Sequence, residues 1–542
     1  MEQLGRSEGV SSTAARTLAL SVLSGGLLSL AFPGTGDLGW LAFFALIPLL
    51  VAIQGRPWRN AGVLGFLAGL VFWLATVSWI APTMVRYGDL PWPLAGLILL
   101  GLAAYLALYP AVFCVLLSRS RLCSGALYVV TAASLWVVLE FLRTFLFTGF
   151  PWNLLGYSQH RNIPLIQVAA VTGVYGVSFV VMAANAALAT MFLTWKDWPR
   201  LLAALGTAGL LLTVAVGYGK LSPLAADAKP AIPVALVQGN IEQDVKWDLA
   251  WQGRTLGIYR DLTVAVAREQ PRLVVWPETA VPFFLREDVR RTEVERLARQ
   301  TATYLLVGAP DRDDGRPRNS AFLVGPEGRI LGRYDKRHLV PFGEYVPLRR
   351  LLPFVNALAA GVIGEDVPGR EATVFSTSIG RFGVIVCYEA IFPDEVREFF
   401  LEGADFLVNI TNDAWFGRSA APAQHLAMAV FRAVENQAYL IRAANTGISA
   451  VVAPDGRVVR SSGLFTREIL SAGITPRSAV SFYTRYGNLF AWGTVGVALA
   501  VAIASLRSRA LRETPPTEAV CVSSKARSSR NGAEDERRDR GA

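Results

Sequence analysis

Hydrophobic residues along this chain gather into long runs before position 220 and once more near position 500. A helix needs about 20 apolar residues to cross a bilayer. Runs of about this length predict eight membrane spans, at residues 18–32, 38–53, 61–80, 94–117, 126–147, 165–193, 201–218 and 489–506. The first run is short and contains Gly25-Gly26, so a cleaved signal peptide is an alternative reading of it. Six further spans follow directly, which favours a membrane helix.

Between the last two runs the pattern changes, and short apolar segments alternate with amphipathic ones. Strands are predicted at 234–237, 273–276, 304–307, 321–324, 384–386, 406–410 and 448–452, and helices at 248–268, 292–304 and 423–444. The sequence Pro-acid-Gly-Arg stands between apolar arms at 326–329 and at 454–457, which predicts two hairpins because Gly supplies positive φ. The alternation indicates a layered α/β domain with a two-sheet core.

Charge adds an orientation to this picture. Charged residues make up 17% of the 542 residues, and the formal net charge is +10. The basic residues form no stripe interleaved with aromatics, so nucleic acid is not an expected partner. They gather instead in alternate loops, which hold Arg6, Arg16, Arg56, Arg59, Arg119, Arg121, Lys196, Arg200, Arg507, Arg509 and Arg512. Loops rich in Lys and Arg remain in the cytoplasm, so both termini are predicted to be cytoplasmic and the α/β domain extracytoplasmic.

The predicted organisation has five parts. They are a cytoplasmic N-terminus at 1–16, a membrane domain of seven helices at 17–220, the α/β domain at 231–475, an eighth membrane helix at 486–506 and a tail at 507–542. The tail mixes Pro, Ser and charges of both signs without periodicity, which predicts disorder.

Of the four cysteines, Cys114 lies within a span, Cys123 at a cytoplasmic edge and Cys521 in the tail. Cys387 is then the only cysteine on the outer side. A lone thiol in an oxidising compartment suggests a function, while a small buried hydrophobe is an equally good interpretation of the residue alone.

Three predicted strands end in residues that can do chemistry together. Glu278 is the last residue of "LVVWPE", Lys336 is the last residue of the arm "ILGRYDK", and Cys387 is the last residue of "FGVIVC". Enzymes of the α/β class assemble their sites where buried strands give way to loops. A carboxylate can accept the proton of a thiol, and an ammonium favours the thiolate and stabilises an oxyanion. The alternative is a turn cap, a lysine that reaches solvent and a core cysteine.

The segments around these residues resemble a known superfamily. "VVWPETA", "RYDKRHLVPFGEYVP" and "GVIVCYEAIFPD" are similar to the Glu, Lys and Cys blocks of the carbon–nitrogen hydrolases, or nitrilases, whose domain is an α-β-β-α sandwich. "TGFPWNLLGYSQ", "NITNDAWFG" and the flanking spans resemble one membrane-bound family of that superfamily, the apolipoprotein N-acyltransferases of the bacterial inner membrane. The resemblance covers roughly residues 17–506.

The resemblance implies acyl transfer through a cysteine thioester, from a phospholipid donor to the N-terminal amine of the diacylglyceryl-cysteine of an apolipoprotein. In it Cys387 is the nucleophile, Glu278 the general base and Lys336 the oxyanion stabiliser. Six further positions match residues of the family's site: Trp247, Asn319, Glu344, Tyr388, Glu389 and Trp415. The amide of Tyr388 is a second oxyanion donor, and loop bracing is the alternative for the two glutamates. Core packing is the alternative for the two tryptophans.

The resemblance implies membrane lipid as surroundings and no cofactor. The three histidines, His160, His338 and His425, show no metal-ligand spacing. The apolar segment 349–364 is predicted to be a flap against the membrane or the acyl chains, with a buried loop as the alternative. Glu140 and Arg143, one helical turn apart, are expected either to pair or to face a lipid head group.

Two other functions fit parts of the sequence. A membrane-tethered amidase or nitrilase would share the three residues and pass the acyl group to water. A transporter or scaffold would carry an inactive outer domain, but it predicts paired ionisable groups deep in the spans, and the sequence has few.

Overall fold

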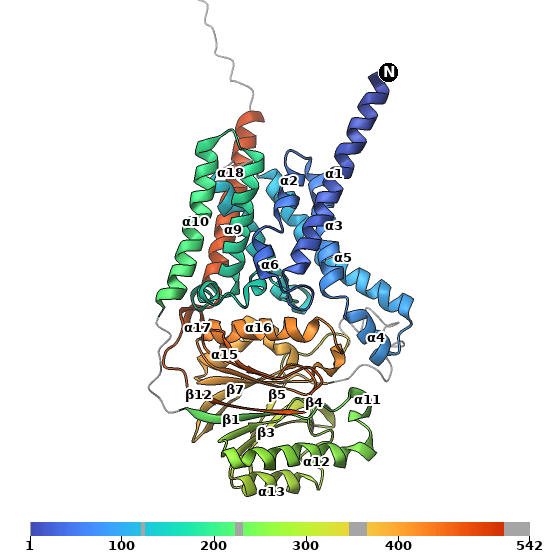
Figure 1. The fold of residues 1–542 in the computed structure, drawn as a ribbon, viewed down its shortest axis with the longest axis vertical. Helices are drawn as coiled ribbons and strands as arrows, with labels where there is room; N and C mark the ends of the chain where they lie inside the picture. The colour runs from blue at the N-terminus through green and yellow to red at the C-terminus, as the bar shows by residue number, and fades with distance from the viewer. Residues whose placement is uncertain (1, 121–124, 223–230, 346–365, 514–542) are drawn as a thin grey trace, which may run out of the picture.

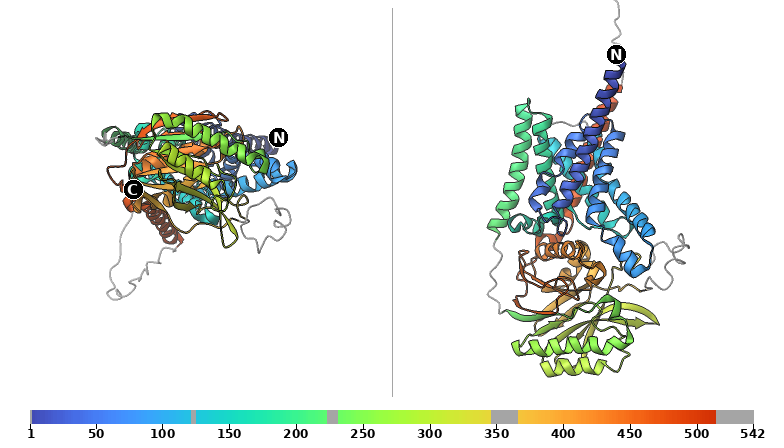
Figure 2. Two further views of the ribbon diagram at one scale, coloured as in Figure 1. Left: turned by 90° about the horizontal axis from the view of Figure 1, so that it is seen from below. Right: turned by 45° about the vertical axis from the view of Figure 1, so that its right-hand side comes forward.

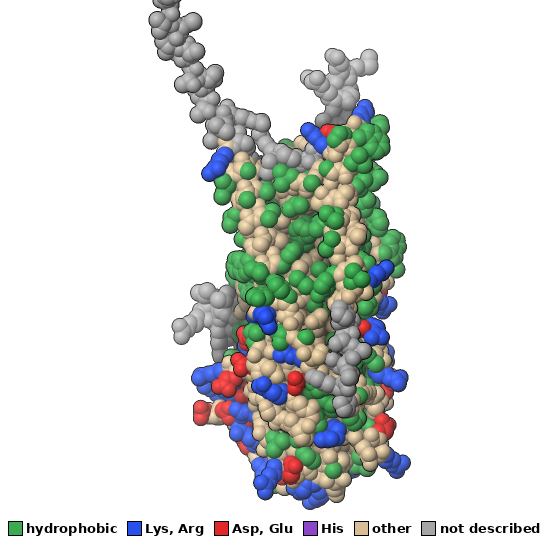
Figure 3. All heavy atoms as spheres, turned by 90° about the vertical axis from the view of Figure 1, so that its left-hand side faces the viewer, with side chains coloured by type: hydrophobic (Ala, Val, Ile, Leu, Met, Phe, Trp, Pro, Cys, Tyr) green, Lys and Arg blue, Asp and Glu red, His purple; other side chains and the backbone are tan. Residues whose placement is uncertain are grey.

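The structure, a computed structural model, describes residues 2–120, 125–222, 231–345 and 366–513. A bundle of helices stands on a layered α/β domain, and two helices of that domain lie between its sheets and the bundle (Figure 1). Apolar side chains cover the visible face of the bundle, whereas Lys, Arg, Asp and Glu gather on the α/β domain (Figure 3). The chain is therefore built as a multi-pass membrane protein.

Seven helices of the described residues are long and apolar enough to cross a membrane. They are α1 (Glu2–Leu30), α3 (Trp58–Thr76), α5 (Trp92–Arg119), α6 (Ala126–Phe145), α9 (Val174–Leu193), α10 (Trp198–Leu221) and α18 (Leu489–Glu513). Residues 38–53, predicted as one span, form two short elements in place of one long helix: a 3-10 helix, η1 (Gly39–Phe43), and a helix, α2 (Ile47–Ile53).

The break in this second span is stabilised by a buried asparagine on α9. Asn185 accepts a hydrogen bond from the amide of Leu46 at 2.9 Å and donates to the carbonyl of Ala42 at 2.7 Å. Inside a bilayer a backbone group released from a helix must find a partner in the protein. The broken segment still crosses the bundle, because α1 and α3 both run toward the α/β domain and the chain has to return between them (Figure 1).

The predicted span at 165–193 is not one continuous helix at its start. Two single turns, α7 (Ile163–Ile166) and α8 (Ala169–Thr172), precede the membrane helix α9, and Gly173 between them and α9 has φ of 65°. The preceding loop lies against the α/β domain. Arg143 donates to the carbonyls of Phe150 and Trp152, at 3.0 and 2.7 Å. Glu140 and Arg143 thus hold the backbone of this loop, since Glu140 accepts the amide of Leu155 at 2.6 Å.

The α/β domain consists of two six-stranded sheets. The first has the order β12 (Glu468–Ile474), β1 (Ile232–Gln238), β2 (Leu273–Val275), β3 (Tyr304–Asp313), β4 (Arg316–Val324) and β5 (Ile330–Asp335). The second has the order β11 (Val458–Ser461), β10 (Ala450–Val452), β9 (Leu440–Ala444), β8 (Phe406–Thr411), β7 (Gly380–Val386) and β6 (Val374–Thr377).

Helices cover the outer face of each sheet. α12 (Leu249–Val266) and α13 (Arg291–Thr301) lie on the first sheet, and α15 (Pro393–Leu401) and α16 (Ala421–Asn436) lie on the second, toward the bundle (Figures 1 and 2). The α-β-β-α sandwich and both hairpins, β4–β5 and β10–β11, are confirmed.

The helix predicted at 423–444 was wrong in its second half. α16 ends at Asn436, where Gln437 adopts φ of 47° and caps the helix, and the next residues form β9. The run "LIRAA" is buried on both faces, and such a run cannot be told from a buried helix by its periodicity.

Polar contacts attach α16 to the bundle. Trp152 Nε1 donates to Gln424 Oε1 at 2.8 Å. Arg432, fully buried, donates to the hydroxyl of Tyr157 at 3.1 Å and to Glu435 at 2.9 Å. Burial of this ion pair is tolerated because each charge has a partner.

Replacing Arg432 with Met is therefore expected to destabilise the protein, because Glu435 would remain buried without its counter-ion. Removal of one partner of a buried pair costs about 3–5 kcal/mol. Thermal unfolding in detergent should show a clearly lower Tm for Arg432→Met than for Arg296→Met, which removes an exposed arginine on α13. Equal melting temperatures for the two variants would contradict this role of the ion pair.

Candidate active site

Three strand ends bring Glu278, Lys336 and Cys387 into one buried site between the sheets. Glu278 follows β2, Lys336 follows β5 in the same sheet, and Cys387 follows β7 in the other sheet. The exposed fractions of the three residues are 5%, 1% and 7%. Lys336 Nζ lies 3.7 Å from Glu278 Oε1, and the charges of both groups act on the Cys387 thiol.

The backbone at Cys387 is strained. Its φ is 52°, in the left-handed region that a residue with a side chain rarely adopts. Such conformations persist only where the surroundings fix them. Glu389 Oε2 accepts the amide of Val386 at 2.6 Å, and His425 Nε2 lies 3.0 Å from the carbonyl oxygen of Cys387. The turn that presents the thiol is thus held from both sides.

Hydrogen bonds orient the carboxylate of Glu278. Asn319 Nδ2 donates to its Oε1 at 2.7 Å, and the amide of Asn412 donates to its Oε2 at 2.7 Å. Lys336 donates to Glu344 Oε1 at 2.7 Å. The acid, the ammonium and a second carboxylate therefore form one network beside the thiol.

Burial and charge set the protonation of the thiol and the amine. Burial raises the pKa of Cys387 above its usual range, and Glu278 raises it further against the opposing effect of Lys336. Burial alone would lower the pKa of Lys336, but Glu344 and Glu278 outweigh it and raise that pKa well above its ordinary value. At neutral pH the site then holds a thiol and an ammonium, and the thiol needs a base before it can attack.

The structure places Glu389 in a bracing position. Its carboxylate accepts hydrogen bonds from Tyr334, Arg337, His338 and Val386 at distances from 2.6 to 3.1 Å. Burial raises the pKa of Glu389 to about 6, against the effect of these donors. These contacts favour the bracing interpretation. Glu344, by contrast, touches the Lys336 ammonium directly.

Neither tryptophan of the predicted set is packed into a core. Trp247 is 48% exposed, and Trp415 is 39% exposed in η6 (Asp413–Phe416). The ring of Trp415 lies 5.1 Å from that of Tyr87 on α4 (Ile80–Gly88). Tyr388 is buried, with its ring 5.2 Å from that of Phe392. The predicted flap at 349–364 lies outside the described residues.

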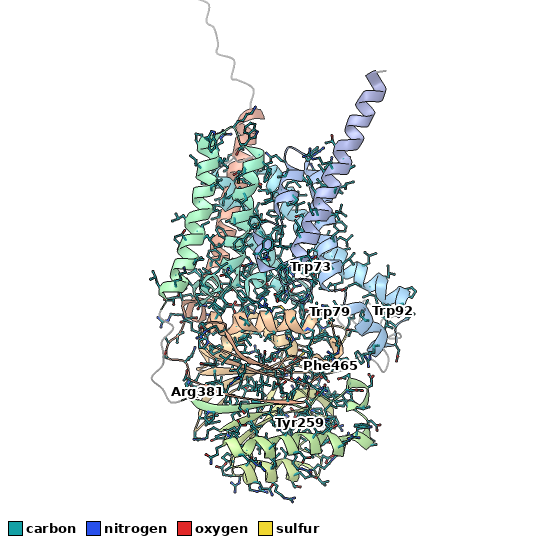
Figure 4. The ribbon with its side chains drawn as sticks, in the orientation of Figure 1. Trp73, Trp79, Trp92, Tyr259, Arg381 and Phe465 are labelled. Atoms are coloured by element: carbon teal, nitrogen blue, oxygen red, sulfur yellow. The ribbon has the colours of Figure 1, made fainter. Side chains whose placement is uncertain are left out.

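Aromatic side chains line the boundary between the site's domain and the bundle. Trp73 and Trp79 lie at the end of the bundle nearest the α/β domain (Figure 4). The ring of Trp79 is 5.2 Å from that of Trp152 and 4.7 Å from that of Phe416. This apolar layer separates the second sheet's helices from the membrane interior.

Sequence reasoning missed a buried polar cluster that contacts the backbone of Cys387 through His425. Arg442 donates to Asp413 Oδ2 at 2.8 Å and to His425 Nδ1 at 3.0 Å. A guanidinium can only donate, so Nδ1 accepts and Nε2 carries the proton that His425 donates to Cys387. Burial, and then Arg442, lower the pKa of His425, which keeps the imidazole neutral. A histidine in the apolar helix "AQHLA" was the one available signal.

His338 has a structural role: it contacts Glu395 at 2.6 Å and stacks on Phe392. No group of three His, Cys, Asp or Glu side chains among the described residues could hold a metal ion.

Comparison with known proteins decides the family. The family described as "Apolipoprotein N-acyltransferase N-terminal domain" matches residues 24–187, and "Carbon-nitrogen hydrolase" matches residues 233–483. The apolipoprotein N-acyltransferase of Geobacter metallireducens is 43% identical over 507 residues, which are 92% of this chain and 96% of that one. This chain belongs to the apolipoprotein N-acyltransferase family.

A second relative agrees with this assignment. The apolipoprotein N-acyltransferase of Methylococcus capsulatus is 35% identical over 89% of this chain and 94% of its own length. Among solved structures, an amidase of Nesterenkonia sp. AN1 from the nitrilase superfamily aligns with 46% of this chain and 93% of its own, at 20% identity and a TM-score of 0.36. As a member of the apolipoprotein N-acyltransferase family, the chain is an enzyme that transfers acyl groups.

The contact of His425 with the backbone of Cys387 gives a testable expectation. His425→Phe keeps an aromatic ring but removes the donor to the Cys387 carbonyl, and an unpaired buried acceptor costs about 1–3 kcal/mol. If that cost falls on the strained turn, acyl transfer should slow by about 10- to 100-fold. The rate would be measured with a labelled acyl donor, in reactions that are stopped at a series of times. His160→Phe, which alters a histidine in contact with Asp37, serves as control, and equal rates in both variants would contradict the assignment.

Proposed function

We propose that this enzyme transfers a fatty acyl chain from a phospholipid, through a thioester on Cys387, to the α-amine of the diacylglyceryl-cysteine of an apolipoprotein. The observation that carries the proposal is the meeting of Glu278, Lys336 and Cys387 in one buried site, on a chain whose relatives bear that activity in their names. The phospholipid donor and the apolipoprotein acceptor belong to the proposal.

In the first half-reaction Glu278 accepts the proton of the Cys387 thiol as sulfur attacks the ester carbonyl. The oxyanion that forms faces the Lys336 ammonium and the amide of Tyr388. When the intermediate collapses, the C–O bond breaks, the thioester remains on Cys387, and the lysophospholipid oxygen takes the proton from Glu278.

In the second half-reaction the amine of the apolipoprotein attacks the thioester carbonyl and gives a proton to Glu278. The C–S bond breaks, an amide is formed, and the sulfur takes the proton back from Glu278. Two substrates that react in turn through a covalent enzyme give ping-pong kinetics. The same carboxylate acts as base and acid in each half.

Exclusion of water supports acyl transfer over hydrolysis. A thioester would be lost if water reached it as easily as the amine. The three residues of the site are almost completely buried, and seven helices of the described residues are apolar and long enough to cross a membrane. A small-amide hydrolase would need neither the helices nor a site closed to water.

We place the α/β domain in the periplasm and both ends of the chain in the cytoplasm. α1 begins and α18 ends at the end of the bundle away from the α/β domain (Figure 1). Basic residues in the loops, such as Arg59, Arg119 and Lys196, support this orientation in a bacterial inner membrane.

Labelled phospholipid is expected to leave its acyl chain on wild-type protein as a hydroxylamine-sensitive adduct, and Cys387→Ala should form none. Mass spectrometry before and after addition of a diacylated lipopeptide should show the adduct's mass disappear as the lipopeptide gains one acyl chain. Adduct at the wild-type level in Cys387→Ala would refute the mechanism. Release of free fatty acid without the lipopeptide, at the same rate as with it, would favour hydrolysis.

Orientation can be measured in whole cells by labelling single cysteines, introduced into protein whose four native cysteines have been replaced with alanine. Val289→Cys lies on the α/β domain, where the native side chain is 84% exposed, and Lys196→Cys lies in the loop between α9 and α10. A thiol reagent that cannot cross the inner membrane should label Val289→Cys in cells with a permeable outer membrane. Lys196→Cys should react only after the inner membrane is opened. The reverse pattern would place the domain in the cytoplasm.

A further inference from the structure

The site contains a second buried lysine that the sequence did not single out. Lys246 ends the short helix α11 (Gln243–Lys246), and its exposed fraction is 1%. Its Nζ donates to the main-chain oxygen of Glu278 at 3.1 Å. An ammonium has three N–H donors, and this oxygen is the one acceptor within hydrogen-bond distance among the described residues.

α11 is connected to Glu278 by two routes. Gln243 lies three residues before Lys246, on the same face of the turn, and its Oε1 accepts from Asn412 Nδ2 at 2.8 Å. The amide of Asn412 donates to Glu278 Oε2 at 2.7 Å. The helix therefore contacts the main chain of the base through Lys246 and reaches its carboxylate through Gln243 and Asn412.

The two lysines of the site differ in their counter-ions. Lys336 is paired with Glu344 at 2.7 Å and lies near Glu278 as well. In the described part of the chain Lys246 has no carboxylate within 4.0 Å, and the charged or titratable groups that act on it are Glu278 and Cys387. Its charge is therefore not already neutralised by a fixed partner.

Acyl transfer moves a negative charge among groups that Lys246 faces. When Glu278 takes the thiol proton, the charge passes from the carboxylate to the sulfur, and attack passes it to the oxyanion. An ammonium that interacts electrostatically with both Glu278 and Cys387 stabilises the charge as it passes from one to the other, without reorganisation of the site.

We propose that Lys246 is a positioning residue of the acyl-transfer site, whose ammonium holds the main chain at Glu278 and compensates the charge that moves from Glu278 to Cys387. This inference rests on the proposed cysteine mechanism and adds a residue to it.

The proposed role of Lys246 predicts that the rate of acyl-enzyme formation depends on pH through its protonation, whereas Lys336 gives no such dependence. Burial lowers the pKa of Lys246 to about 8, against the effects of Glu278 and Cys387, whereas the pKa of Lys336 lies well above its ordinary value. Lys246 is an ammonium below about pH 8 and a neutral amine above it. Acyl-enzyme formation should therefore slow as the pH rises through about 8.

The test measures single-turnover formation of the acyl-enzyme with a fluorescent phospholipid in detergent, from about pH 6 to about pH 10. Wild-type protein should show the alkaline fall in rate. Lys246→Met should be about 10- to 100-fold slower at neutral pH and show no such fall. Lys246→Arg, whose charge persists to high pH, should restore part of the rate and shift the fall upward. Lys220→Met, an exposed lysine at the end of α10, should behave like wild type.

A purely structural role of Lys246 would lower stability or the rate without moving the pH profile. The proposal is overturned if wild-type formation of the acyl-enzyme shows no fall near pH 8, a result that needs no variant to fold. It is equally overturned if Lys246→Met keeps the wild-type rate and profile. Absence of acyl-enzyme from wild-type protein at every pH would instead refute the proposed function.

Discussion

The buried ammonium of Lys336 constrains the rest of the catalytic domain. A lone charge removed from water costs several kcal/mol, and the cost falls only when counter-charges and hydrogen bonds are close. Glu344 and Glu278 provide these at 2.7 and 3.7 Å. The side chain of Asn319 donates to Glu278, and the main-chain oxygen of Asn319 accepts the amide of Lys336. These two hydrogen bonds connect the strand ends of the first sheet. The carboxylate of Glu278 is oriented by the same contacts that stabilise the buried ammonium of Lys336.

The second sheet meets this network with a cysteine whose backbone is strained. Cys387 adopts φ of 52° at the end of β7. Glu389 accepts the amide of Val386 just before it, and His425 donates to the carbonyl of Cys387 itself. Since Arg442 can only donate, His425 has a single useful tautomer. The conformation of Cys387 therefore depends on a chain of buried polar groups.

The sequence was sufficient to predict what depends on local pattern. Functional residues commonly lie where strands give way to loops. The predicted ends of β2, β5 and β7 were therefore enough to bring Glu278, Lys336 and Cys387 together. The sequence was not sufficient where a structural feature depends on a hydrogen-bond partner far away in the chain. The break in residues 38–53 depends on Asn185, about 140 positions later, and Lys246 becomes a residue of the site only because Glu278 folds against it. β9 could not be predicted as a strand, because a strand buried on both faces shows no alternation of polar and apolar residues.

The membrane domain takes part in positioning Cys387 as well as in anchoring the enzyme. One continuous apolar core includes Leu28 and Phe72 of the bundle together with Val384 of β7. Two consecutive residues of α16 bind different domains. Gln424 binds Thr76 and Trp152 of the bundle, and His425 binds the carbonyl of Cys387. Because the two residues share one helical turn, a displacement of α16 relative to the bundle would also disturb the strained turn at the thiol. The close packing of the two domains thus couples the helix bundle to the geometry of the Cys387 thiol.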